Sequence, residues 1–134
     1  MIFLSGEVHS SKNSKRIFVN SKTGRPFISK SKASKADEGS FALQLNNQRA
    51  EWLRMTAGLP YPLYVSLRFI RQTLRIFDYT NISQGVLDAL VAAEYLPDDS
   101  MKFVIPVFLP YTVDKRCPGC EINILAGLFT DAPE

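Results

Sequence analysis

Residues 63–70 alternate between strictly apolar and mixed side chains, and this alternation constrains the fold more than any other feature of the chain. Every second position is a large apolar residue: Leu63, Val65, Leu67 and Phe69. A period of two is typical of a β-strand that turns one face to the hydrophobic core. Such a strand needs a second layer of structure to cover that face.

Helical patterns on both sides of this strand can supply the second layer. Residues 34–56 lack proline and are rich in Ala, Leu, Gln, Glu and Arg, which predicts one long helix ended by the glycine and proline that follow. A second helix is predicted over residues 81–93, with Thr80 or Asn81 as its N-cap. The apolar residues at helical spacing that we expect in the core are Phe41, Leu45, Trp52, Met55, Ile82, Val86 and Leu90.

Shorter β-prone runs complete the predicted sheet. Pro106 and Pro110 interrupt an apolar run over residues 101–111, which places that run at a sheet edge or divides it by a bulge. The order of elements predicts an α+β fold, a two-layer domain with two helices packed on a mixed or antiparallel sheet. The other β-prone runs are residues 2–8, 16–20, 25–28 and 121–125, the middle two forming a hairpin.

Length and composition are those of one globular domain. With 134 residues, 46% of them hydrophobic and 22% charged, the chain predicts a single domain over residues 1–134 and a flexible tail over about residues 126–134. No run is long enough to cross a bilayer, and the first residues lack the basic flank and apolar stretch of a signal peptide. We therefore expect a cytoplasmic protein without a membrane partner.

Charge is divided unevenly along the chain. Residues 1–35 carry eight Lys or Arg and one acid, hence +7, whereas the other residues carry eight against twelve, hence −4. This division predicts a basic segment, residues 9–35, that faces a polyanion such as DNA, beside a separate acidic site. On charge alone, a solvated basic loop is an equally good interpretation.

Several classes of enzyme are excluded by what the sequence lacks. Its one histidine, His9, cannot supply a HExxH zinc site, a histidine-metal nuclease site or a Ser-His-Asp triad. No Walker loop and no dinucleotide fingerprint is present, so we expect no nucleotide cofactor. Carboxylate chemistry remains.

Three aspartates are the candidates for that chemistry. Asp78 precedes the second predicted helix, and Asp98 and Asp99 follow it. A helix of about 13 residues rises about 20 Å, and five extended residues span about 17 Å back, so the three can converge within one subunit or across a dimer. Carboxylate oxygens suit Mg²⁺ or Mn²⁺, which can polarise a phosphate and activate water.

A plainer interpretation of these aspartates is stronger on the residues alone. Asp78 can simply favour the positive end of the helix that follows it. Asp98 and Asp99 can form an ordinary acidic turn.

Three short motifs change this balance. These motifs are Asp78-Tyr79-Thr80-Asn81, the step Val86-Leu87-Asp88-Ala89-Leu90, and Leu96-Pro97-Asp98-Asp99. Together they resemble the signature of RusA-type Holliday junction resolvases. The loop at residues 11–16 resembles the opening loop of that family, and residues 24–30 are similar to the hairpin of its phage-borne members. The likeness extends over about residues 3–125.

The resemblance implies a specific activity. It implies a homodimer in a bacterial or phage-infected cell that binds four-way junctions and makes paired, Mg²⁺-dependent nicks during DNA recombination and repair, with Mn²⁺ as a possible substitute. It also implies that Asp78 and Asp99, with Asp98 beside them, are the catalytic metal ligands. Asp88 fits a supporting or structural role as well as that of a ligand.

Two positions depart from the family pattern. Thr80 stands where the family has a second aspartate, and Gln84 stands where it often has a lysine. Either change can weaken catalysis, although Thr80 can still offer a neutral oxygen or cap the helix. The alternative function is therefore a non-catalytic protein of the same fold that binds DNA junctions.

Clustered cations give the predicted DNA contacts, since they release counterions from phosphates without reading base sequence. Phe18 and Phe27 are candidate stacking groups, although a core role is more common for phenylalanine. Cys117 and Cys120 resemble half of a zinc site but leave the metal two ligands short, which favours an incidental turn pair. The expected DNA-binding residues are Lys12, Asn13, Lys15, Arg16, Lys30, Lys32 and Asn81.

Overall fold

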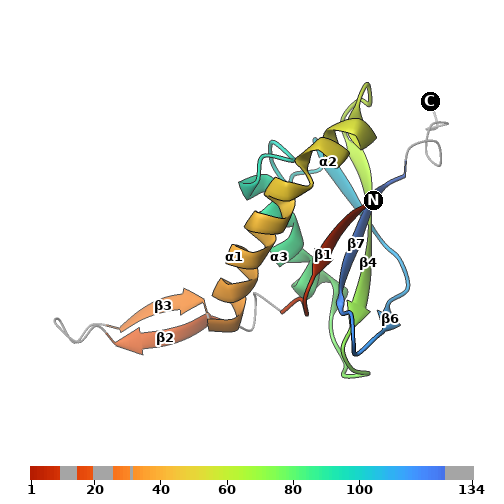
Figure 1. Cartoon of the computed structure of the whole chain (residues 1–134). Coiled ribbons are helices and arrows are strands. Elements are labelled where there is room, and N and C mark those ends of the chain that lie inside the picture. Colours follow the sequence, from red (N-terminus) through yellow and green to blue (C-terminus); the bar gives the residue numbers. More distant parts are fainter. Residues whose placement is uncertain (10–14, 20–25, 31, 126–134) are drawn as a thin grey trace.

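The chain folds into helices that cover a mixed β-sheet, as the computed structural model in Figure 1 shows. The structure describes the backbone of residues 1–9, 15–19, 26–30 and 32–125, and side chains within 1–9 and 39–125. The helices are α1 (Lys32–Asn47), α2 (Arg49–Thr56) and α3 (Tyr79–Ala92). The strands are β1 (Ile2–Ser5), β2 (Lys15–Val19), β3 (Pro26–Lys30), β4 (Leu63–Arg71), β5 (Val104–Phe108), β6 (Thr112–Val113) and β7 (Gly119–Ile124).

Strand β4 is central to the sheet, whose order is β1-β7-β4-β5, with β6 paired to the far end of β4. It runs antiparallel to β7 and parallel to β5 and β6. The predicted alternation is confirmed, because the four apolar positions of the pattern are all buried. The α+β class and the two-layer arrangement are confirmed as well.

The core lies between the sheet and the helices. Phe41 and Leu45 of α1, Trp52 of α2, and the stripe of α3 are buried against apolar residues of the central strands. Of the helical residues expected in the core, Met55 is the exception, being only partly buried at its edge. Among the described residues, no helix is both long and apolar enough to span a membrane.

The predicted long helix is divided in two at Gln48, which was not expected. The backbone of Gln48 (φ −109°, ψ 10°) leaves the helical conformation. Its N–H donates to the Leu45 carbonyl, three residues back instead of the four of an α-helix (3.1 Å). Its side chain is used elsewhere, since the amide donates to the Phe3 carbonyl (2.8 Å) and accepts from the Phe3 N–H (2.9 Å).

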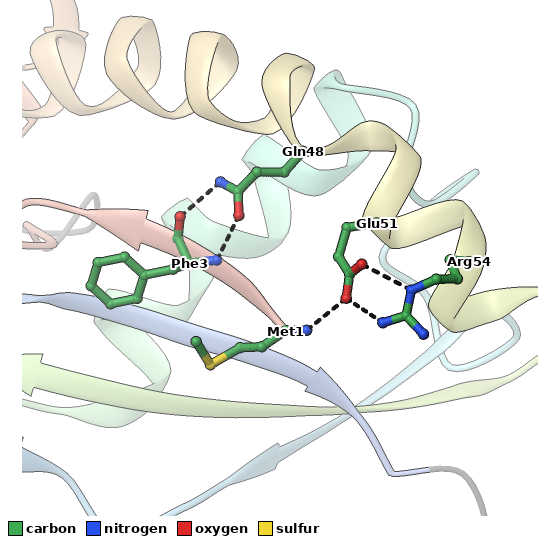
Figure 2. Close-up of polar contacts among 5 residues, drawn as sticks. All are labelled: Met1, Phe3, Gln48, Glu51 and Arg54. Carbon is green, nitrogen blue, oxygen red and sulfur yellow. Dashed lines mark hydrogen bonds and ion pairs between the residues drawn. The ribbon is translucent and has the colours of Figure 1, made fainter.

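Gln44 and Gln48 together seal the edge of the sheet. Gln44 makes the same two-way contact with the backbone of Ser5, accepting at 2.6 Å and donating at 3.0 Å. Residues four apart on a helix are separated by about 6 Å, which nearly matches two residues of a strand. Figure 2 shows the Gln48 pair, with Glu51 farther along binding the Met1 ammonium and Arg54. We call Phe3, Ser5 and these two glutamines the sealed β1 edge.

Gly119 lets β7 approach β1 closely. A Cβ atom at this position would lie 2.3 Å from the Leu4 carbonyl oxygen and 2.7 Å from the Phe3 ring.

The neighbouring Cys120 is fully buried, and burial raises the pKa of its thiol far above the ordinary value, whereas Cys117 is exposed. A metal needs the thiolate, so this pair is a poor zinc half-site.

The other predictions of local structure are largely confirmed. Strands β2 and β3 form the predicted hairpin, shifted by one or two residues, and Figure 1 draws it beyond the first turn of α1. Strand β5 lies at the sheet edge and contains Pro106, as the apolar run predicted. The first strand ends at Ser5 rather than at residue 8. The tail at residues 126–134 lies outside the described residues.

Candidate active site

Asp78 is fixed at the first turn of α3. It is the N-cap residue, and its Oδ1 atom accepts from both the N–H (3.0 Å) and the hydroxyl (2.6 Å) of Thr80. The prediction that Thr80 or Asn81 caps this helix was therefore wrong. An aspartate at this position satisfies a free N–H of the first turn, and the helix dipole favours its negative charge. Thr80 thus holds one oxygen of Asp78.

The chain returns to α3 after the helix ends. Glu94 adopts a left-handed conformation (φ 63°) that turns the backbone, and the next two residues are buried. The Tyr95 hydroxyl donates to the Leu45 carbonyl, and Trp52 Nε1 donates to the Tyr95 carbonyl at 3.1 Å. These contacts with α1 and α2 fix where the segment containing Asp98 and Asp99 begins.

Gln84 joins two carboxylates on the exposed side of α3. Its Nε2 atom donates to Asp88 Oδ1 at 2.8 Å and more weakly to Asp99 Oδ2 at 3.4 Å. Thr80, Gln84 and Asp88 are four residues apart in turn, so they lie along one face of the helix. We call these three residues, together with Asp78 and Asp99, the carboxylate face of α3.

The three predicted metal ligands are not gathered at one point. Asp78 is bound at Thr80 and Asp99 at Gln84, and about 9 Å of helix rise separates Asp78 from Gln84. Asp98 is exposed beside Asp99. Within the part of the chain that the structure describes, no group of three or more His, Cys, Asp or Glu residues is placed to hold a metal ion.

The residues present fit a magnesium ion only in a restricted way. Aspartate oxygens are suitable ligands, and Mg²⁺ in proteins commonly keeps several waters and uses one or two carboxylates plus substrate phosphates. The carboxylate face of α3 offers such a partial set, and it does not offer a closed protein cage. Phosphate and water would have to supply the remaining ligands.

An open pocket of about 690 Å³ lies beside Asp78. Three of its seven lining residues are aromatic, and two of these, Tyr79 and Phe108, are stacked at 5.5 Å between ring centres. This aromatic group was not predicted from the sequence, although Phe77 and Tyr79 flank Asp78 directly. The pocket is lined by Ile76, Phe77, Asp78, Tyr79, Thr80, Asn81 and Phe108.

The predicted DNA contacts lie mainly in the N-terminal part of the chain. The hairpin register pairs Lys15 with Lys30 and Arg16 with Ser29, and Lys32 begins α1. Phe18 is paired with Phe27 in the same hairpin. Lys12 and Asn13 lie outside the described residues. Asn81 is in the first turn of α3, within the pocket beside Asp78.

A scan against models of known protein families found no match to this chain, and a search of curated proteins found none either. The likeness to RusA-type resolvases therefore remains a prediction from the motifs.

Proposed function

We propose that this protein is a Mg²⁺-dependent endonuclease that cuts branched DNA, with the four-way junction as its substrate. The observation that carries the proposal is the return of Asp99 to the helix that Asp78 caps. Carboxylates distant along the chain thereby line one exposed face of α3. The motif likeness to RusA-type resolvases supports the same activity.

In this proposal junction binding brings Asp78 and Asp99, which lie apart in the structure, onto one ion together with a DNA phosphate, with Asp98 beside them. When bound, Mg²⁺ polarises the phosphate and lowers the pKa of an attacking water. Thr80 holds Oδ1 of Asp78 through both its N–H and its hydroxyl, which fixes the orientation of the carboxylate. Gln84 keeps Asp99 beside the helix.

The basic segment, residues 9–35, binds the phosphates of the junction arms in this proposal. A homodimer, located in the cytoplasm, places two such sites on one junction and makes paired nicks. Replacing Lys12 and Lys15 together by alanine should weaken binding and lower the slope of log affinity against log salt by about 2, because each released counterion contributes about 0.9. An unchanged slope would remove both lysines from the interface.

The direct test is cutting of a labelled four-way junction by the purified protein, with and without Mg²⁺. Nicks should appear only with Mg²⁺, and a linear duplex of the same sequence should stay intact. Asp78→Asn and Asp99→Asn should each lower cutting at least about a hundredfold while preserving junction binding, because metal ligands are lost. Asp114→Asn is the matched control, since Asp114 is an exposed aspartate whose carboxylate accepts from the Arg116 N–H and has no part in the proposed site, and equal cutting by all variants would refute the assignment.

A second candidate is a junction-binding protein without nuclease activity. The contact of the Gln84 amide with two carboxylates favours it, since a neutral donor already stands where a cation would neutralise them. The same assay separates the two candidates. Junction DNA that is shifted but uncut with Mg²⁺ present supports the second.

A further inference from the structure

Arg71, the last residue of β4, contacts two other segments of the chain. Its Nη1 atom donates to the Val8 carbonyl at 2.7 Å, and its Nη2 atom pairs with Glu7 Oε1 at 3.0 Å. Its guanidinium also lies over the Phe77 ring, 4.8 Å from the ring centre. One side chain therefore joins the segment after β1 to the segment before α3.

Glu7 completes this joint with its second oxygen. Oε2 accepts from the Gln72 N–H at 2.9 Å, so both oxygens of the carboxylate are used. The Arg71 and Glu7 side chains are only 13% and 20% exposed. A charge-assisted contact that is mostly shielded from solvent is stronger than an open surface pair.

The joint lies between the two parts that the proposed function requires. Val8 directly precedes the basic segment, residues 9–35, and Phe77 directly precedes Asp78. Phe77 also packs edge-on against Tyr79, at 5.0 Å between ring centres. A shift of the chain at Val8 would thus be transmitted through Arg71 to the first turn of α3.

We propose that Arg71 is a positioning residue that couples DNA bound at the basic segment to the placement of Asp78. The cutting assay that tests this role of Arg71 rests on the proposed function. The joint needs a planar guanidinium, because a lysine ammonium cannot donate in two directions and lie flat on a ring at once. Arg68 on the same strand differs, since it meets Glu121 at 3.6 Å and both side chains are about one-third exposed.

The test compares Arg71→Lys and Glu7→Gln with the control Arg68→Lys. At saturating junction, the single-turnover cutting rate of Arg71→Lys should fall at least about tenfold, because small displacements of a catalytic group are costly. Junction affinity should stay within about threefold of the parent. Glu7→Gln should show a smaller loss in the same direction, and Arg68→Lys should cut normally.

An NMR measurement keeps the test independent of cutting. The Thr80 backbone amide donates to Asp78, and the shift of its resonance on addition of junction DNA should be smaller in Arg71→Lys and Glu7→Gln than in the parent and in Arg68→Lys, because the direct effect of DNA near Asn81 is common to all four proteins. Equal shifts in parent and variants would overturn the coupling. An uncut junction with the predicted resonance pattern would refute the nuclease and leave the coupling standing. A junction cut at equal rates by Arg71→Lys and Arg68→Lys would support the nuclease and overturn the coupling.

Discussion

The sealed β1 edge and the carboxylate face of α3 both depend on glutamine side chains, yet they use them differently. At the edge, Gln44 and Gln48 each satisfy one backbone donor and one backbone acceptor. On α3, Gln84 uses its amide hydrogens on two exposed carboxylates that keep further lone pairs. The first arrangement is complete and closes a strand to other chains, whereas the second is incomplete and can accept a ligand.

The largest effect on the edge is expected from Gly119→Ala. The added methyl group would overlap the backbone of β1 at Leu4, and backbone cannot give way as a flexible side chain does. We expect a loss of about 3 kcal/mol in the free energy of unfolding, measured by urea denaturation. Gly58→Ala is a poor control because its φ is positive, so Gly85→Ala, in open space on α3, is the better one. Equal losses in the two variants would show that β1 and β7 do not approach this closely.

The variants Gln48→Ala and Gln84→Ala test the difference between the two regions directly. Gln48→Ala leaves two partly buried backbone groups of Phe3 without partners, and should cost about 2 kcal/mol of stability. Gln84→Ala removes exposed contacts and should cost less than about 0.5 kcal/mol. Cutting should respond in the opposite order, falling about tenfold for Gln84→Ala and staying normal for folded Gln48→Ala. Similar stability losses for the two would remove the distinction between the regions.

The smallest effect concerns pH and the end of the sealed β1 edge. The hydrogen bond from Arg54, with a further one from the Met1 ammonium, lowers the pKa of Glu51 from 4.5 to about 2. A lowered pKa in the folded state stabilises the protein above pH 4.5, and this stabilisation is lost as pH falls toward 2. Glu51→Gln should therefore flatten the fall in stability across this window. Urea midpoints at pH values on both sides would measure it, and an unchanged slope would mean that the contact is absent in solution.

The sequence predicted the features that depend on local pattern. The period of two gave β4, helical spacing gave the buried stripe of α3, and Pro106 indicated an edge strand, because each signal is contained in a few neighbouring residues. The break at Gln48 was missed because its cause is the backbone of Phe3, which is distant along the chain. The insertion of β7 between β1 and β4 likewise depends on long-range pairing.

The carboxylate face was predicted only in part. The order of the motifs indicated Asp78 and Asp99. The structure returns Asp99 to α3 only as far as Gln84, short of the convergence with Asp78 that the estimated reach allowed. The contacts of Thr80 and Gln84 with these aspartates were not foreseen, since Thr80 was expected to cap the helix or offer a neutral oxygen and Gln84 was treated only as a departure from a pattern. A side chain's partner depends on the fold, and spacing alone does not supply it.

The central claim is that the carboxylate face of α3 holds a divalent ion on branched DNA. It is tested most directly by a crystal of the protein bound to a four-way junction and soaked in Mn²⁺. Anomalous scattering should place the ion about 2.1 Å from carboxylate oxygens of Asp78 and Asp99, with a DNA phosphate completing its ligands. Junction DNA bound at the basic segment, with no ion at either aspartate, would contradict the claim.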